Sequence, residues 1–105
     1  MTEIKFYKQG GLITGFEITG HSTSSVNDFE GKLVCSAVSS AAYMAANTLL
    51  DVIKAEAVTD VNDGYMLVKL SSKLEESQIT LNGFLIHSNE LAKQYRNYLK
   101  VYSEV

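Results

Sequence analysis

Several residue types that define whole classes of protein are scarce or missing in this sequence. It has no proline, no tryptophan and a single cysteine, Cys35, among its 105 residues. A lone cysteine cannot form an intrachain disulfide, which excludes the small disulfide-stabilised secreted scaffolds. The nine basic residues include only one arginine, Arg96, and the lysines are scattered. Because nucleic-acid binding proteins usually carry clustered basic residues, arginine among them, we expect no direct contact with nucleic acid.

Long hydrophobic runs and targeting signals are also absent. No stretch approaches the ~18 consecutive apolar residues that a membrane-spanning helix needs. Residues 1–5 lack the basic segment and apolar core of a signal peptide. We therefore expect a cytoplasmic protein with no membrane partner.

The length and composition indicate one folded domain over residues 1–105. Chains divide into several domains only beyond about 250–300 residues. The content of 46% hydrophobic and 20% charged residues is ordinary for a globular protein and excludes a disordered or fibrous chain. The formal net charge of -3 favours a basic partner.

Hydrophobic periodicity predicts the secondary structure. Alternating apolar and polar residues predict β-strands, and apolar residues three and four positions apart predict α-helices. Glycine-containing turns at 9–11 and 62–64 divide four strands into two hairpins. The predicted strands are 4–8, 12–19, 52–61, 65–70 and 98–105, and the predicted helices are 33–50 and 77–95. The order β-β-α-β-β-α-β predicts an α+β fold with a mostly antiparallel sheet and two helices.

Two residues could form a nucleophilic site. Cys35 falls in the first turn of the helix predicted from Leu33, where unpaired backbone N–H groups stabilise an anion such as a thiolate. His21 follows Gly20 at the end of a predicted strand, one polar loop before the cysteine. If that loop folds back, the imidazole can exchange a proton with Cys35, as a cysteine hydrolase requires. The same two residues also fit a small buried core side chain and a turn histidine, so spacing alone leaves both interpretations open.

The motifs Gly20-His21 and Leu33-Val34-Cys35-Ser36-Ala37-Val38-Ser39 resemble those of the bacterial ribosomal-processing cysteine protease family (Prp). In that family a Gly-His at a strand end and a Cys-x-x-x-Ser at a helix start form the active site. The resemblance implies a cysteine protease without metal or cofactor, in which Cys35 is the nucleophile and His21 the general base. Ser39 and Gly20 would support them, and Gly31 would give the preceding loop freedom to close over a peptide.

The resemblance also implies a substrate and an assembly state. Members of the family remove a short N-terminal extension from a large-subunit ribosomal protein, the one numbered twenty-seven. The precursor of that protein is therefore the implied peptide partner. The family resemblance further implies a homodimer.

Three features depart from the family pattern. Ser22 stands where a small alanine is typical, and the loop from His21 to Cys35 is slightly longer than usual. The third is a change of charge. The family carries an acidic residue three positions before the cysteine, where this sequence has Lys32.

Asp28 or Glu30 could orient His21 instead. The alternative interpretation is that both are ordinary loop carboxylates exposed to solvent. Lys32 also keeps open a function of another class, a catalytically inactive ribosome-associated binding or dimerisation module of the same fold. We expect His87 to be structural, because it lies on a predicted helix beside Ile86 and Ser88. One cysteine and two distant histidines also give no zinc-binding spacing.

Overall fold

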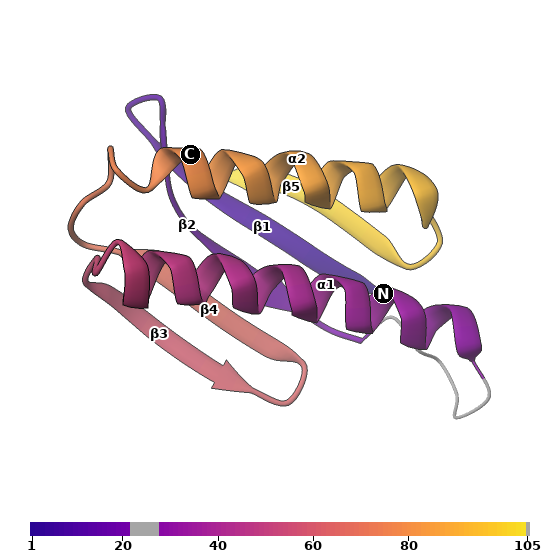
Figure 1. Cartoon of the computed structure of the whole chain (residues 1–105). Coiled ribbons are helices and arrows are strands. Elements are labelled where there is room, and N and C mark those ends of the chain that lie inside the picture. The colour runs from indigo at the N-terminus through magenta and orange to yellow at the C-terminus, as the bar shows by residue number, and fades with distance from the viewer. Residues whose placement is uncertain (22–27, 105) are drawn as a thin grey trace.

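The structure is a five-stranded β-sheet with two helices packed on one of its faces (Figure 1). It is a computed structural model that describes residues 1–21 and 28–104. The elements are β1 (Thr2–Gln9), β2 (Leu12–Thr19), α1 (Phe29–Asn47), the π-helical turn η1 (Thr48–Val52), β3 (Ala57–Asn62), β4 (Tyr65–Leu70), α2 (Gln78–Gln94) and β5 (Leu99–Glu104). The predicted order β-β-α-β-β-α-β is confirmed. Residues 22–27 of the polar loop predicted between His21 and Lys32, and the last residue of the final predicted strand, Val105, lie outside the described residues.

The sheet has the strand order β3-β4-β2-β1-β5. β1 pairs with β2, β2 with β4 and β3 with β4 in antiparallel fashion, whereas β1 and β5 are parallel. Parallel neighbours need a crossover connection, and α2 supplies it by carrying the chain from β4 to β5 across one face of the sheet. The two helices run antiparallel to each other on that face (Figure 1). The mostly antiparallel α+β fold is therefore confirmed.

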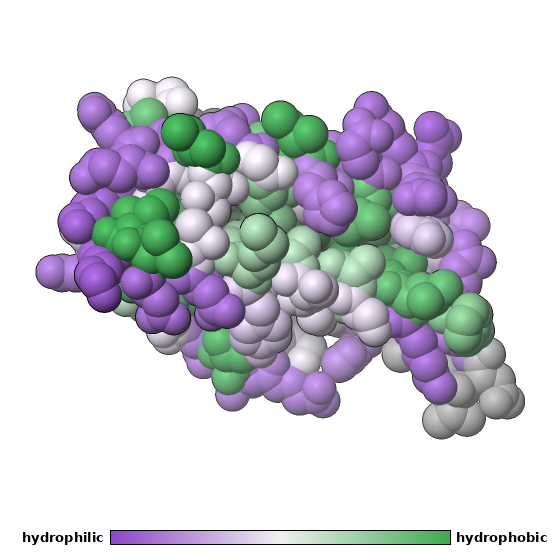
Figure 2. All heavy atoms as spheres, in the orientation of Figure 1, coloured by the Kyte–Doolittle hydropathy of each residue, from purple (hydrophilic) through white to green (hydrophobic). Residues whose placement is uncertain are grey.

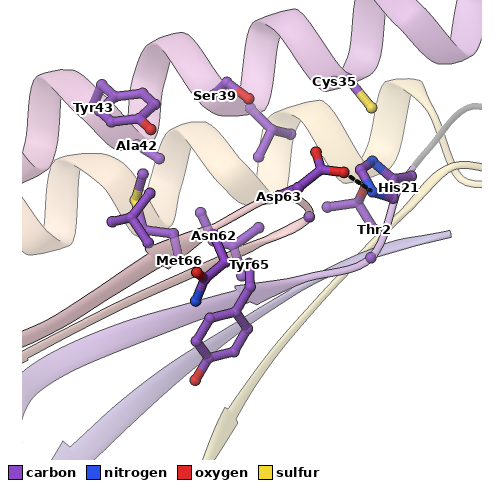
Figure 3. A pocket seen from close by; sticks show the side chains of 15 residues that line it. Thr2, His21, Cys35, Ser39, Ala42, Tyr43, Asn62, Asp63, Tyr65 and Met66 are labelled. Atoms are coloured by element: carbon purple, nitrogen blue, oxygen red, sulfur yellow. Dashed lines mark ion pairs between the residues drawn. The ribbon is translucent and has the colours of Figure 1, made fainter.

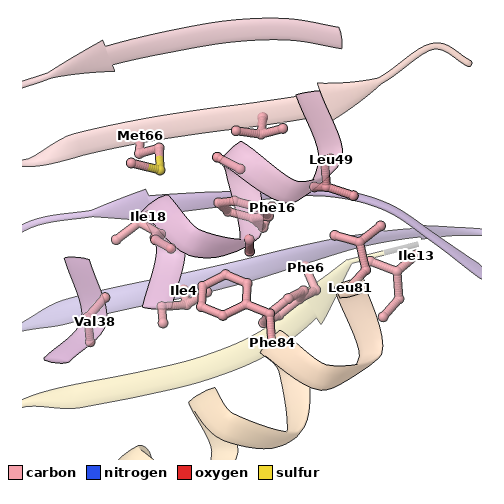
Figure 4. Close-up of a cluster of buried hydrophobic side chains, with 14 of the residues drawn as sticks. Ile4, Phe6, Ile13, Phe16, Ile18, Val38, Leu49, Met66, Leu81 and Phe84 are labelled. Atoms are coloured by element: carbon pink, nitrogen blue, oxygen red, sulfur yellow. The ribbon is translucent and has the colours of Figure 1, made fainter. Parts of the chain in front are cut away.

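The hydrophobic core lies between the helices and the sheet. Its centre is an aromatic cluster in which the ring of Phe84, from α2, lies 4.9 Å from Phe16 and 5.4 Å from Phe6 in edge-to-face contacts (Figure 4). Phe6 and Phe16 belong to the apolar sides of the two strands whose alternation the sequence shows. Each such aromatic pair contributes about 0.5–1.5 kcal/mol beyond the burial of its apolar area.

The first helix begins four residues earlier than predicted, at Phe29 instead of Leu33. Asp28 caps it, because the side-chain carboxylate accepts a 2.9 Å hydrogen bond from the Gly31 backbone N–H. The Asp28 carbonyl oxygen accepts another, at 3.1 Å, from the N–H of Lys32. Such a cap satisfies orphan N–H groups and stabilises a helix by about 1 kcal/mol. The prediction of a flexible loop at Gly31 was therefore wrong, since this glycine lies inside the first helical turn.

The second hairpin begins later than predicted, since β3 starts at Ala57 and not at Val52. Helical structure continues beyond α1 through η1, whose last residue is Val52. Lys54 then adopts a positive φ of 64°, and the Ala55 N–H donates a 2.9 Å hydrogen bond to the Leu49 carbonyl. A left-handed residue of this kind is typical of helix ends. It turns the chain before the strand can start.

The second helix has the predicted position. It spans Gln78–Gln94, directly after Ser77 and before Tyr95. Ser77 does not cap the helix through its side chain, because its hydroxyl donates a 2.8 Å hydrogen bond to the Lys73 carbonyl. Gly83 lies in the exposed middle of the helix without interrupting it.

The helical stretch Phe29–Val52 has 24 residues and is long and apolar enough to cross a membrane by length and composition alone. Part of its apolar surface packs within the fold, since Val34, Val38, Ala42 and Leu49 are buried in the core, whereas Phe29 and Met44 are exposed. Core helices of globular proteins meet the same two criteria. The composition of this helix is therefore weak evidence for a membrane span.

Candidate active site

The register between β2 and β4 determines where His21 lies. Thr19 pairs with Tyr65, so the residues after the end of β2 lie beside the turn that precedes β4. The N–H of Gly20 donates a 2.9 Å hydrogen bond to the carbonyl of Gly64, which continues the pairing beyond the strand. His21 therefore leaves the sheet next to the β3–β4 turn.

Gly20 has a conformation that other residues rarely adopt. Its φ is 87°, and a Cβ at this position would collide with the carbonyl oxygen of Met1. Only glycine fits both the backbone angle and the close approach without strain. This is a physical reason for the glycine that precedes His21.

Cys35 lies on the side of α1 that faces His21. Its side chain is partly buried, and Figure 3 shows the sulfur directed from the helix toward the imidazole ring. Ser39 and Tyr43 follow Cys35 at intervals of four residues, which places the three side chains along one face of the helix. All three line the same cavity.

The prediction that Cys35 occupies the first turn of the helix was wrong. It is the seventh residue of α1, which begins at Phe29. Its backbone N–H therefore lies within the helical hydrogen-bond ladder, and the anion-stabilising effect of a helix start is confined to the first turn. Lys32 is exposed in that first turn, one helical turn before Cys35. The helix start therefore supplies no such stabilisation to a thiolate at Cys35.

A cavity of about 300 Å³ brings the two predicted catalytic residues together. The side chains of His21 and Cys35 both line it, together with Ser39 and Gly20 (Figure 3). Gly31 is not among the described residues that line it. The cavity thus combines a thiol, an imidazole and hydroxyl groups, which is the set that nucleophilic thiol chemistry uses.

Asp63, in the β3–β4 turn, is a residue of this cavity that the sequence did not reveal. Its Oδ2 atom lies 4.0 Å from Nε2 of His21 (Figure 3). The Asp63 side chain is 99% exposed and that of His21 53% exposed, so the ion pair is open to solvent. In the sequence this aspartate belongs to an ordinary Asn-Asp-Gly turn, and nothing there relates the turn to His21. The relation comes from the pairing of β2 with β4.

The two carboxylates that the sequence suggests as orienting groups lie at the start of α1. Asp28 caps the helix and also accepts a 3.5 Å hydrogen bond from the hydroxyl of Tyr98. Burial raises the pKa of Tyr98, and the negative charges of Asp28 and Glu30 raise this pKa further. Glu30 is exposed and forms no ion pair with the part of the chain that the structure describes. An orienting role for either residue stays a prediction.

Tyr65 connects the cavity with the face of the sheet that the helices leave open. Its hydroxyl donates a 2.6 Å hydrogen bond to the Glu17 carboxylate, which raises the pKa of Tyr65 to about 12 and lowers the pKa of Glu17. The ammonium group of Lys5 lies 3.3 Å from the same carboxylate. The pKa of Lys5 is raised, first by its contact with Tyr7 and then by Glu17. These contacts tie β1, β2 and β4 together next to the site.

A larger hollow between the two helices has different chemistry. Its volume is about 670 Å³, and Figure 2 shows pale and green side chains along the helices, bordered by purple polar ones. Met44 and Ile79 expose 74% and 88% of their surface there. His87 lines this groove, and no cysteine or carboxylate of the described residues does. The cavity at His21 and Cys35 is therefore the candidate active site.

Comparison with known proteins identifies the family. The family profile described as "Cysteine protease Prp" matches residues 1–100. No curated protein matches the chain.

Solved structures share the fold over nearly the whole chain. The crystal structure of an essential ribosomal processing protease Prp from S. aureus with a covalently linked product peptide is 15% identical, covers 99% of this chain and 100% of that one, and has a TM-score of 0.85. The same protease with a substrate peptide is 14% identical, with the same coverage and TM-score. The structure of SMU.848 from Streptococcus mutans is 26% identical, covers 99% of this chain and 96% of that one, and has a TM-score of 0.79. From the profile match it follows that this chain belongs to the cysteine protease Prp family.

Proposed function

We propose that this chain is a cysteine endopeptidase in which Cys35 is the nucleophile and His21 the general acid and base. The observation that carries the proposal is the meeting of these two side chains in one cavity, from the end of β2 and from the face of α1 (Figure 3). Membership of the cysteine protease Prp family supports the same reaction class.

The mechanism follows from the groups that line the cavity. The thiolate of Cys35 attacks the scissile carbonyl carbon, and the C–N bond breaks as His21 gives a proton to the leaving amine. Water then attacks the thioester carbon while His21 accepts its proton. The C–S bond breaks, the carboxylic acid product leaves and ionises, and the Cys35 thiolate is restored beside protonated His21. Ser39, one helical turn after Cys35, can donate a hydrogen bond to the developing oxyanion. The N–H groups of the helix start, which were predicted to lie next to Cys35, lie in an earlier turn of α1.

We further propose that the substrate is the precursor of the large-subunit ribosomal protein numbered twenty-seven, whose N-terminal extension is removed. The resemblance of the Gly-His and Cys-x-x-x-Ser motifs to those of the Prp family supports this, as does the fold shared with a ribosomal processing protease that binds a substrate peptide. The net charge of -3 suits a basic partner such as a ribosomal protein.

Assembly and location complete the proposal. The family resemblance supports a homodimer. The proposed ribosomal substrate supports a location in the cytoplasm, where ribosomes are assembled. Sedimentation of the purified protein should give twice the mass of the chain, and a monomer at all concentrations would contradict the dimer. Cell fractionation should place the protein in the cytosolic fraction, and recovery in membranes would contradict a cytoplasmic location.

Cleavage of the precursor tests the function directly. The purified chain should shorten the precursor at a single site near its N-terminus, as mass spectrometry of the products will show. Cys35→Ala should remove all detectable cleavage, and His21→Ala should lower kcat by about 10²–10⁴-fold. His87→Ala is the matched control, because His87 lies in the other hollow and should leave kcat unchanged. Binding of the precursor without any cleavage would instead support the inactive binding module.

Alkylation provides a second test that needs no substrate. Because Cys35 is the only cysteine, the rate of reaction with iodoacetamide reports on this thiol alone. A nucleophile paired with His21 should react as a thiolate below about pH 8.5, the ordinary pKa of a free cysteine, and His21→Ala should remove that advantage. Equal rates in the two proteins at every pH would contradict the pairing.

A further inference from the structure

We propose that the β3–β4 turn is the positioning device for His21, with the Asp63 carboxylate orienting the imidazole ring and the Gly64 backbone supporting it. The inference rests on the proposed function, because it concerns how that site is kept in a productive geometry. It assigns Asp63 as a positioning residue, in a chain that has Lys32 where the family resemblance leads one to expect an acid. Three separate contacts carry it.

The first contact is electrostatic. Oδ2 of Asp63 lies 4.0 Å from Nε2 of His21. Asp63 is the one acidic residue among the described residues that line the cavity, and the other titratable residues there are Cys35, Tyr43 and Tyr65. A carboxylate on this side of the ring favours the tautomer that carries its proton at Nε2.

The second contact is steric. A Cβ added to Gly64 would lie 2.6 Å from Nε2 of His21 and 3.1–3.2 Å from two ring carbons. The backbone of Gly64 therefore lies directly against the imidazole, and a side chain at this position would displace the ring from the place it occupies. The positive φ of 71° at Gly64 is a second reason for glycine at this position.

The third contact holds the turn against the strand that carries the histidine. The Gly20 N–H donates a 2.9 Å hydrogen bond to the Gly64 carbonyl, one residue before His21. A shift of the turn would therefore move both the carboxylate and the backbone that face the ring. The turn and the histidine form one unit although they are distant in the sequence.

This arrangement presents the imidazole to Cys35. Asp63 contacts one ring nitrogen, and Figure 3 shows the other on the side of the ring nearer to Cys35. With the proton held at Nε2, Nδ1 offers a lone pair in the direction of the thiol. Because misplacement of a catalytic group by about 1 Å can lower a rate 10²-fold, a positioning contact of this kind affects the reaction more than the stability of the fold.

The test compares Asp63→Asn, Asp63→Glu and Gly64→Ala with two matched controls. Asp60→Asn removes a charge at a nearby exposed position of β3 that does not line the cavity. Gly11→Ala adds the same methyl group to another turn glycine of positive φ, 81°, where no atom lies within 4 Å. Peptide cleavage gives kcat and KM for each protein, and urea unfolding shows whether each variant remains folded.

We expect Asp63→Asn to lower kcat by about tenfold with little change in KM. This is less than the roughly 10²–10⁴-fold that an acid–base group itself contributes, because Asp63 acts only through His21. Asp63→Glu should recover most of that loss, since the exposed position gives the longer carboxylate room to reach the ring. Gly64→Ala should lower kcat at least as much, whereas both control variants should keep the kcat of the unmodified chain.

A spectroscopic measurement makes the result independent of activity. The ¹⁵N chemical shifts of the imidazole ring report the tautomer of His21. The chain has two histidines, so the variant His87→Gln removes the signals of His87 and identifies those of His21. Asp63→Asn should decrease the population of the Nε2–H tautomer. An unchanged tautomer would overturn the inference, whether or not the chain cleaves a peptide.

The kinetic outcomes separate this inference from the proposed function. If Cys35→Ala abolishes cleavage while Asp63→Asn and Gly64→Ala keep the full kcat, the function stands and the positioning role is overturned. An equal loss in Asp60→Asn would also overturn it, because the effect would then not be specific to Asp63. If the unmodified chain does not cleave, the function fails and the tautomer measurement still decides the role of Asp63.

Discussion

The hydroxyl of Tyr65 donates a 2.6 Å hydrogen bond to the carboxylate of Glu17, across the pairing of β4 with β2. The bond keeps the proton on the tyrosine and the charge on the glutamate. The same pairing places His21 beside the β3–β4 turn, so the contact stabilises the part of the sheet on which the candidate site is built.

We predict that this pair makes the stability of the protein depend on pH in two ranges. The pKa of Glu17 is lowered from 4.5 on folding, so its contribution is present above that pH and is lost as the pH falls. The pKa of Tyr65 is raised from 10.0 to about 12, so its contribution is present below pH 10 and is lost as the pH rises toward 12. The measurement is the free energy of unfolding in urea at a series of pH values.

Tyr65→Phe is the variant for that measurement, because it keeps the ring and removes the hydroxyl. In this variant the free energy of unfolding should decrease less than in the unmodified chain, both as the pH falls into the acid range and as it rises toward 12. Tyr102→Phe, on β5, is the control that removes a hydroxyl from a tyrosine outside this pair. Superimposable pH profiles for Tyr65→Phe and the unmodified chain would contradict the assignment.

Gly20→Ala should damage both the fold and the site. The backbone there has a φ of 87°, and the new Cβ would collide with the Met1 carbonyl oxygen. A residue forced into such a conformation costs about 1–3 kcal/mol, and relief of the collision would displace the strand end next to His21. Urea unfolding and peptide cleavage should both show the loss. Full cleavage activity in a destabilised Gly20→Ala protein would show that this glycine contributes to stability but not to the candidate active site.

Gly83→Ala should have the opposite effect on stability. This glycine lies in the middle of α2, and an added Cβ would meet no atom within 4 Å. Alanine favours a helix interior over glycine by about 0.5–1 kcal/mol, so the midpoint of urea unfolding should rise by a corresponding amount. Gly15→Ala is the contrasting variant, because its Cβ would collide with the Val68 carbonyl in the central sheet. A stabilised Gly15→Ala protein would refute this steric explanation.

Asp28→Ala should destabilise the protein by about 1 kcal/mol through loss of the helix cap. Asp28→Asn keeps an oxygen that can cap the helix and should retain most of the stability. The pKa of Tyr98, measured by ultraviolet titration, should fall in both variants because the negative charge of Asp28 raises it. Cleavage by Asp28→Asn then tests the prediction that Asp28 orients His21. A large decrease in kcat in this stable variant would favour that role.

Much of the fold could be predicted because it follows from local patterns. The alternation in β1 and β4 reflects one covered and one open face of the sheet, which is why the faces of Met66 and Tyr65 were predictable. The start of α1 was misplaced because Gly31 is typical of a loop, while the cap from Asp28 stabilises the helix across it. The start of β3 was misplaced because alternation after α1 does not reveal a π-helical turn that ends at Val52.

The sequence by itself determined the order of the elements and the two motifs that contain His21 and Cys35, because periodicity and motif spacing are local properties. It suggested acids close to Cys35 in the chain as partners for the histidine. Only the tertiary structure placed the Asp63 carboxylate beside His21 and the backbone of Gly64 against its ring. The physical reason is the hydrogen-bonded register of β2 with β4, which joins two distant segments in a way that neither segment encodes alone.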